Sequence, residues 1–300
     1  KGWDSMKILT NTRCSDMKKA LIYCDSHDLH YEFKVTQRLT GRILMNEWDY
    51  LLKTNSESDV LFFIKPFDDT WKSNEIRETN TRYKNNRRIG LHMFWWKYKD
   101  ITNVLDVVKQ QNFDFIQITP CQGVKENNNR FWIFYQPLAM RFVDNPMGNK
   151  EELKELCKKA KELGITVVAD VIMRHVAGNN RGELKPSEKV DEKLLPYILN
   201  DKINCDDYED RWKYTNLCTG MPMCNIWNED YQAICRDFLD ELIDIGITGI
   251  RLDQLMHYPT RSEGCSFLKN VFEPYEDKFD MIYGEIIFKS REVNDLYINY

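Results

Sequence analysis

The chain has 300 residues, of which 42% are hydrophobic and 30% charged, and a formal net charge of -5. It is long enough to bury a sizeable core, has no long basic block of the kind that binds nucleic acid, and has no run near the roughly 20 apolar residues that span a bilayer. We therefore expect a globular, soluble protein with a neutral ligand, no nucleic-acid partner and no membrane partner.

Residues 1–85 are predicted to form a small α/β accessory domain. Patterns typical of strand, helix, strand, helix and strand follow one another at 6–11, 15–24, 30–35, 46–53 and 59–65. The segment Cys14-Ser-Asp-Met17, between the first strand and helix, resembles a glutaredoxin-like domain. Met17 stands where a redox motif has its second cysteine, so dithiol exchange between these positions is impossible and we expect an inert unit. The polar stretch 75–88 would be the linker.

Residues 86–300 alternate between strands and helices in the way that builds a parallel sheet. Near-continuous apolar runs predict five strands covered on both faces, at 89–95, 113–120, 165–172, 247–253 and 281–287. Apolar residues at helical spacing predict helices at 101–111, 150–163 and 228–243. The polar, loop-rich segment 176–226 breaks this rhythm, and we predict an insertion that overhangs a site at the strand ends.

Ionisable residues close three of the predicted strands. They are the runs 170–175 and 251–257 and the single residue Glu285. An acidic residue at the end of one strand could equally cap the next helix. Three such strand ends together favour a shared site, because a parallel barrel gathers its active-site groups at the carboxyl ends of its strands.

Four motifs, in register with these strands, resemble those of the α-amylase family, glycoside hydrolase family 13. They are the aromatic Tyr-Gln-Pro segment at 131–137 followed by Gly148, Asp-Val-Ile-Met-Arg-His at 170–175, Gly-Ile-Arg-Leu-Asp-Gln-Leu-Met-His at 249–257, and Tyr-Gly-Glu at 283–285. The resemblance implies an α/β fold over 86–300, the first five strands of a (β/α)8 TIM barrel, with 176–226 as its inserted domain B-like segment.

The resemblance also implies the chemistry. Two carboxyl groups roughly 5 Å apart cleave a glycosidic bond with retention, one as nucleophile and one as acid and base. Asp253 would be the nucleophile and Glu285 the general acid/base, while Arg251 keeps Asp253 ionised and oriented. The implied substrate-binding residues are Tyr135, Gln136, His175, Arg251 and His257, with Asp170 as a structural residue near the site. Core or loop roles for Tyr135, Gln136 and the two histidines are the alternative.

Two departures from the family pattern concern a structural calcium. Arg174 replaces the usual Asn, whose side-chain oxygen binds the ion in the family, and Met223 replaces a carboxylate ligand. A guanidinium has no acceptor atom, and calcium does not prefer sulfur ligands. We therefore expect no metal and no cofactor. Met256 replaces the Lys often found before the second-region histidine, which leaves the substrate preference open.

The nine cysteines are odd in number and not tightly spaced, which favours free thiols and a cytoplasmic location. The predicted function is that of a retaining glycosidase for α-linked glucans such as starch, glycogen or maltooligosaccharides. An α-glucan transglycosylase, a non-catalytic glucan-binding barrel and a redox-linked protein are the alternatives. The family's last three strands and its third acidic residue have no counterpart before residue 300, so this segment alone is expected to be inactive.

Overall fold

The structure is a computed structural model that describes residues 88–110, 112–126, 130–180, 183–286 and 297, together with the backbone of 6–10 and 59–63. Seven strands form one sheet in the order β1 to β7, and every neighbouring pair is parallel. The strands are β1 (Met6–Thr10), β2 (Asp59–Phe63), β3 (Ile89–Met93), β4 (Phe115–Ile118), β5 (Thr166–Val171), β6 (Gly249–Leu252) and β7 (Met281–Gly284). The five strands predicted after residue 86 are therefore confirmed.

The sheet has two strands more than the predicted five-stranded arc. β2 pairs with β3 in the register Val60↔Ile89, and β1 pairs with β2, so β3 is not an edge strand of the sheet. Pairing satisfies the backbone groups that an edge strand otherwise leaves exposed. The two described strands of the segment predicted as an accessory domain thus belong to the barrel sheet. The rest of 1–85, including Cys14 and Met17, lies outside the described residues, and the boundary at 85 stays a prediction.

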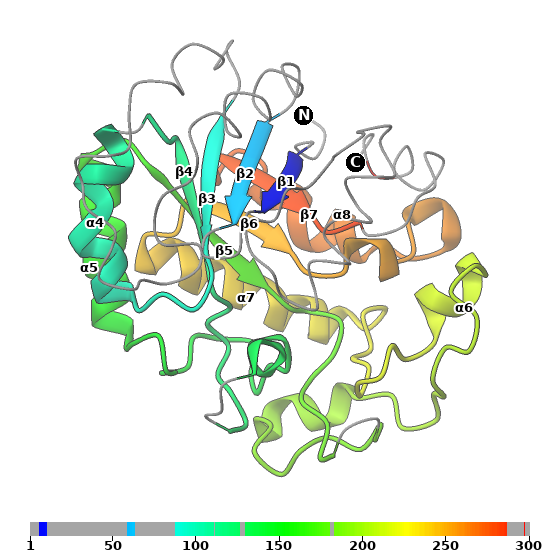
Figure 1. Cartoon of the computed structure of the whole chain (residues 1–300). Coiled ribbons are helices and arrows are strands. Elements are labelled where there is room, and N and C mark those ends of the chain that lie inside the picture. Colours follow the sequence, from blue (N-terminus) through cyan, green and yellow to red (C-terminus); the bar gives the residue numbers. More distant parts are fainter. Residues whose placement is uncertain are drawn as a thin grey trace.

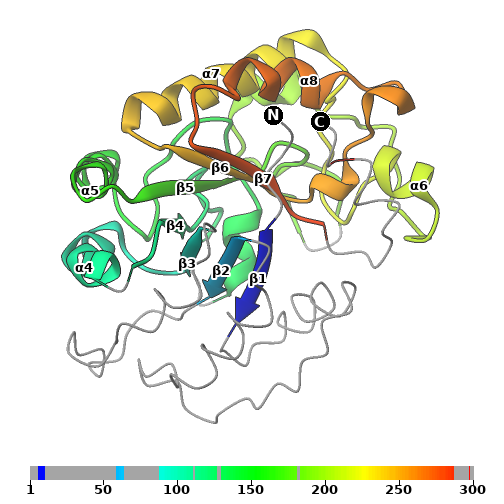
Figure 2. The ribbon, with the colours of Figure 1, turned by 90° about the horizontal axis from the view of Figure 1, so that it is seen from above.

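Helices cover the outer face of the curved sheet (Figure 2). The four are α4 (Tyr98–Gln110), α5 (Lys150–Glu162), α7 (Glu229–Ile245) and α8 (Phe267–Phe272). α5 begins at Asn149 with a capping box to Glu152, and α7 begins at the side-chain cap of Asn228 and ends at Gly246, whose φ of 107° is favourable for glycine. The first three correspond to predicted helices, whereas α8 was not predicted.

The inserted segment lies below the sheet in the view of Figure 1. Its described residues contain the short helices η2 (Glu192–Tyr197) and α6 (Arg211–Asn216), joined by loops and isolated bridges such as Ile198↔Cys224. Three short helices follow β6 or precede β7, namely η3 (Leu255–His257), η4 (Arg261–Glu263) and η5 (Glu273–Tyr275). The inserted segment has little regular structure, and backbone hydrogen bonds such as Ala177 N–H to Pro137 O at 2.9 Å and Asp191 N–H to Leu138 O at 2.8 Å join it to the rest of the chain.

The inside of the barrel contains an apolar layer of Phe115, Val168, Met281 and Tyr283, all buried. Phe115 fits because Gly90 lies opposite it, where a Cβ atom would come within 2.2 Å of the Phe115 ring. This layer forms the floor under the polar residues at the carboxyl ends of the strands.

The seven cysteines among the described residues are all free and buried. None of the helices that the structure describes has the length and apolar composition to cross a membrane. The cytoplasmic location stays a prediction.

Candidate active site

Strand alternation and register bring the charged residues together. Asp170 of β5 lies beside Arg251 of β6, and Arg251 lies beside Tyr283 of β7. Asp253 and Glu285 come two residues after Arg251 and Tyr283, directly beyond the ends of β6 and β7, and successive side chains of a strand alternate between its faces. The two predicted catalytic carboxyl groups therefore emerge from neighbouring strands at the carboxyl end of the sheet.

The Arg251 guanidinium is the centre of the site. Its Nη1 donates to Asp170 Oδ1 at 2.6 Å and to Asp253 Oδ1 at 2.9 Å, and its Nη2 forms an ion pair with Glu285 Oε1 at 2.8 Å. Arg251 is 4% exposed, and it carries one positive charge against three carboxyl groups. A planar guanidinium suits this arrangement because its donors point in fixed directions.

Asp170 is fully buried and held by several donors. Its Oδ2 accepts hydrogen bonds from Tyr135 Oη at 3.1 Å and from Gln117 Nε2 at 3.3 Å. Burial raises the pKa of Asp170 to about 6 and the charge of Glu285 adds to this effect, although Arg251 opposes it. Both oxygens of Asp170 thus accept hydrogen bonds inside the barrel, and its structural role stays a prediction.

Asp253 is 4% exposed, and its backbone N–H donates to Val171 O at 2.9 Å. Burial raises the pKa of the Asp253 carboxyl well above its ordinary value, Glu285 and Asp170 raise it further, and Arg251 lowers it. One guanidinium does not neutralise three carboxylates, so the cluster retains a proton more readily than separate carboxyl groups do.

Glu285 lies at the open side of the cluster, with 24% of its side chain exposed. Its backbone N–H donates to Leu252 O at 2.9 Å, and its Oε2 accepts from the backbone N–H of Gln254 at 3.3 Å. Leu255 packs tightly against Gly284, where a Cβ atom would come within 2.4 Å of the Leu255 side chain. The loop after β6 therefore supports Glu285 directly.

Tyr135 stands beside the charged cluster at the end of η1 (Phe131–Tyr135). Its ring stacks on Phe94 with centroids 5.8 Å apart, and the Arg251 guanidinium lies 5.9 Å from its centroid. Gln136 follows it and is 8% exposed, with its backbone N–H donating to Ile133 O. Tyr135 therefore lies against the charged cluster with Gln136 next to it in the chain, and their substrate-binding roles stay predictions.

Both predicted histidines are buried, and each is anchored to a backbone carbonyl. His175 Nε2 lies 2.8 Å from Tyr135 O, and His257 Nδ1 lies 2.8 Å from Tyr214 O. Burial lowers the pKa of His175 to about 4 and that of His257 to about 3. Both rings are therefore neutral near pH 7 and offer one donor and one acceptor nitrogen each.

Three residues that sequence reasoning missed complete the polar layer: Gln117, His92 and Tyr283. Tyr283 Oη donates to Gln117 Oε1 at 2.5 Å, and Gln117 Nε2 lies 3.2 Å from His92 Nε2. Each is the last but one residue of its strand, His92 in β3, Gln117 in β4 and Tyr283 in β7. Their polar side chains within otherwise apolar strand sequences could have indicated that they belong to the site.

The structure also tests whether Arg174 and its surroundings fit a metal ion. Arg174 is 1% exposed, and its Nη2 donates to Thr215 O and Leu217 O, both at 2.9 Å. Its Nη1 has no hydrogen-bond partner, and the described residues contain no group of three or more His, Cys, Asp or Glu side chains that could hold a metal. Carbonyl oxygens that bind a guanidinium do not fit a calcium site at the same place.

A parallel (β/α) barrel sheet with a carboxylate cluster at the carboxyl ends of its strands defines the class of protein. Within that class, residues 85–280 match the family model of the alpha amylase catalytic domain, and the chain belongs to the alpha-amylase family.

Known proteins agree with this assignment. The chain is 29% identical over 226 residues to an alpha-amylase from Clostridium acetobutylicum, covering 72% of this chain and 30% of that protein. It is 27% identical to an alpha-amylase-related protein from Drosophila auraria, covering 61% of this chain and 39% of that protein. The chain therefore spans well under half the length of these relatives.

Solved structures share the fold. An alpha-amylase I variant from Eisenia fetida in complex with maltohexaose superposes with a TM-score of 0.57 at 18% identity, over 67% of this chain and 45% of that one. An alpha-amylase from Geobacillus thermoleovorans in complex with acarbose gives 0.55 at 22% identity, over 80% of this chain and 50% of that one.

Proposed function

We propose that this chain is part of a retaining glycosidase that acts on α-glucans such as starch, glycogen or maltooligosaccharides. Asp253 is the nucleophile and Glu285 the general acid/base. The observation that carries the proposal is that both carboxyl groups contact one guanidinium, Asp253 through Nη1 at 2.9 Å and Glu285 through Nη2 at 2.8 Å. A shared contact of this kind is compatible with the short separation that retention requires.

In the proposed reaction, Glu285 donates a proton to the glycosidic oxygen while Asp253 attacks the anomeric carbon and forms a covalent glycosyl-enzyme. Glu285 then removes a proton from water, which attacks the same carbon and releases Asp253. The reaction requires Glu285 to carry a proton and Asp253 to be ionised when substrate is bound. The ion pair between Glu285 and Arg251 must therefore open when the sugar arrives, and the exposed position of Glu285 allows this.

The sugar itself is held by neutral groups. Tyr135 offers its ring face, and we assign hydrogen bonds with sugar hydroxyls to His175 and His257, whose lowered pKa values keep them uncharged near neutral pH. Gln136 is assigned to the same wall of the site by its position after Tyr135. Uncharged donors and acceptors suit a neutral glucan better than charged groups do, because less desolvation opposes binding.

The test is turnover of maltohexaose by the full-length protein carrying Asp253→Asn or Glu285→Gln. We expect Asp253→Asn to reduce release of reducing sugar to background and Glu285→Gln to lose about 10²- to 10⁴-fold in kcat. Asp106→Asn is the matched control, because Asp106 pairs with Lys159 on the outer helices at 2.6 Å. Normal turnover by Asp253→Asn would contradict the proposal. So would a lack of turnover in both the wild type and the Asp106→Asn control.

Product analysis in the same assay distinguishes the alternatives. A second sugar can attack the covalent intermediate in place of water, so longer oligosaccharides among the products would indicate a transglycosylase. Tight binding of maltohexaose by the wild type without any turnover would indicate a glucan-binding barrel.

We further propose that Arg174 takes the place of the family's structural calcium. Its buried guanidinium supplies a fixed positive charge to the carbonyls of Thr215 and Leu217, which joins the end of β5 to the inserted segment without a metal. Met223 adds no carboxylate to this region.

A further inference from the structure

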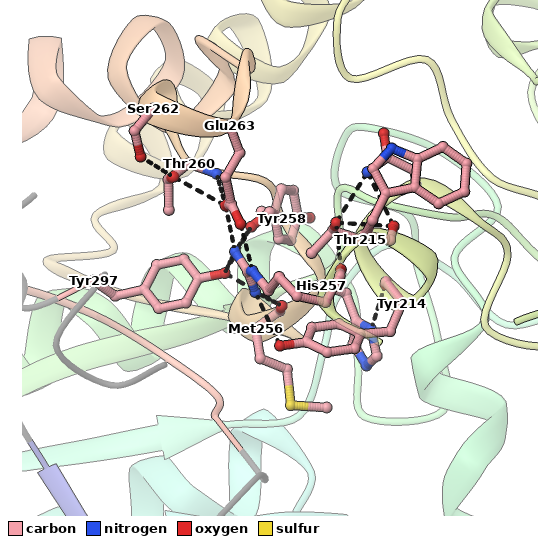
Figure 3. Close-up of polar contacts among 12 residues, drawn as sticks. Tyr214, Thr215, Met256, His257, Tyr258, Thr260, Ser262, Glu263 and Tyr297 are labelled. Atoms are coloured by element: carbon pink, nitrogen blue, oxygen red, sulfur yellow. Dashed lines mark hydrogen bonds and ion pairs between the residues drawn. The ribbon is translucent and has the colours of Figure 1, made fainter. Parts of the chain in front are cut away.

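A second arginine, Arg211, connects the inserted segment to the loop after β6. Arg211 is the first residue of α6, and it forms a two-point ion pair with Glu263, Nε to Oε1 and Nη2 to Oε2, both at 2.7 Å. Its Nη1 donates to Met256 O at 2.8 Å, and its Nη2 donates to Tyr258 O at 3.2 Å. Figure 3 shows the side chains of Glu263 and Tyr297 pointing toward one another, and both contact the Arg211 guanidinium.

The two carbonyls that Arg211 binds flank His257 on either side. Tyr297 Oη reinforces them, donating to Tyr258 O at 2.6 Å and lying 3.2 Å from Met256 O and 2.8 Å from Arg211 Nη2. The same short loop touches both proposed catalytic groups, because it starts at Asp253 and because Met256 N–H donates to Glu285 O at 3.2 Å. A displacement at Arg211 would therefore reach the centre of the site through two or three residues.

α6 makes a second contact with His257 itself. Tyr214, three residues after Arg211, accepts a hydrogen bond from His257 Nδ1 at 2.8 Å, and its ring meets the imidazole edge-on at 5.6 Å. A carbonyl oxygen can only accept, so Nδ1 carries the hydrogen and Nε2 of the neutral ring is the acceptor nitrogen. The position of α6 thus sets the tautomer of His257 as well as its place.

We propose that Arg211 is a positioning residue for the glycosidase reaction, holding the loop after β6 so that His257 and the backbone beside Glu285 keep their places. This inference rests on the proposed function. It assigns to the inserted segment a direct part in organising the active site. Lysine cannot replace arginine here, because it lacks the planar fork that reaches a carboxylate and two carbonyls at once.

Electrostatics favours a permanent ion pair at this position. Burial opposes the charge on Arg211, but the hydrogen bonds to Glu263, Tyr214 and Tyr297 raise the pKa of its guanidinium above the ordinary value. The Glu263 carboxyl also accepts from the backbone N–H of Thr260 at 2.7 Å, which fixes it to the far end of the loop. The contact therefore persists across the pH range of an enzyme assay.

The test compares Arg211→Gln, Arg211→Lys and Arg141→Gln in the full-length protein. Arg141 is the matched control because it also joins the barrel to the inserted segment, through Asp191 at 3.1 Å, but it makes no described contact with the loop after β6. We expect both Arg211 variants to lose roughly 10- to 100-fold in kcat/KM for maltohexaose, since small misplacements near the reacting atoms are costly. Arg141→Gln should stay within about threefold of wild type.

A double-mutant cycle shows whether Arg211 acts through His257. In a His257→Ala background, Arg211→Gln should lower kcat/KM by a clearly smaller factor than it does in the wild type, because one of the two groups that it positions is gone. The proposal would be overturned if the double variant lost kcat/KM by the full product of the two single losses. It would also be overturned if Arg211→Gln were as active as Arg141→Gln. If Arg211→Gln does not fold, Tyr297→Phe removes one hydroxyl from the same contact and should give a smaller loss of the same kind.

An NMR measurement that does not depend on turnover tests the positioning role of Arg211 separately from the proposed glycosidase activity. The ¹⁵N NMR signals of the His257 ring, assigned by their loss in His257→Ala, should shift in Arg211→Gln and not in Arg141→Gln. If the wild type fails to cleave maltohexaose, the proposed function is wrong, yet a shifted signal still supports the positioning role. Unchanged His257 signals in Arg211→Gln contradict it whatever the activity.

Discussion

One buried arginine lies at the strand ends and another lies where the chain leaves β5 and contacts the inserted segment, and the two sites differ in what surrounds the charge. Arg251, 4% exposed, faces the carboxyl groups of Asp170, Asp253 and Glu285. Arg174, 1% exposed, donates to the carbonyls of Thr215 and Leu217, and no described carboxylate pairs with it. Ion pairs with carboxyl groups stabilise the charge of Arg251, whereas only hydrogen bonds to carbonyl groups stabilise the charge of Arg174. The same side chain is therefore expected to contribute differently to stability and chemistry in the two regions.

The largest expected effect comes from Arg251→Met. The substitution leaves three buried carboxyl groups without their cation, and breaking a buried ion pair costs about 3–5 kcal/mol. We expect a loss of that size in the free energy of unfolding, measured by urea denaturation of the full-length protein, and loss of maltohexaose turnover. Arg251→Lys keeps the charge without the fork and should lose less stability. A stable, active Arg251→Met protein would show that the carboxyl groups do not depend on this guanidinium.

Much of the strand-end region could be predicted from the sequence because strand periodicity fixes it. The alternation of side chains places Asp170, Arg251 and Glu285 on the inner face once the strands are identified, and parallel pairing then brings them together. The caps at Asn149 and Asn228 likewise mark helix starts through local chemistry.

The contacts of the inserted segment could not be predicted in this way. Arg174 and Arg211 bind carbonyl oxygens, which every residue carries, so the sequence does not indicate which ones they reach. The pairing of β2 with β3 was missed for a related reason, because the register Val60↔Ile89 joins backbone groups that are identical in all strands. Long-range contacts made by the backbone leave little signal in side-chain patterns.

A smaller effect is expected from Arg174→Met. The change leaves the carbonyls of Thr215 and Leu217 without a donor, at about 1–3 kcal/mol, but it also removes the cost of burying an unpaired charge. We therefore expect a smaller loss in the free energy of unfolding than for Arg251→Met. The wild type should melt at the same temperature in calcium chloride and in EGTA. A melting temperature that rises with calcium would contradict the replacement of the ion by Arg174.

The smallest effect, a change of slope with pH, distinguishes the two regions most directly. Burial raises the pKa of Asp170 to about 6, from about 4 in an unfolded chain. A carboxyl group with a raised pKa stabilises the folded protein fully below about pH 4, and this contribution is lost as the pH rises through about 6. Asparagine does not titrate, so the free energy of unfolding of wild type relative to Asp170→Asn should fall between these pH values, by an amount on the order of 1 kcal/mol.

The comparison of slopes is informative because Asn also disturbs the hydrogen bonds of Asp170 with Tyr135 and Gln117, which shifts the whole curve without tilting it. Arg174→Met should keep the wild-type slope, since no described carboxyl group with a raised pKa pairs with Arg174. Urea denaturation at pH 4, 5, 6 and 7 measures all three curves. Parallel curves of unfolding free energy against pH for the wild type and Asp170→Asn would contradict a raised pKa at Asp170. They would mean that Arg251 offsets the cost of burying the Asp170 carboxylate.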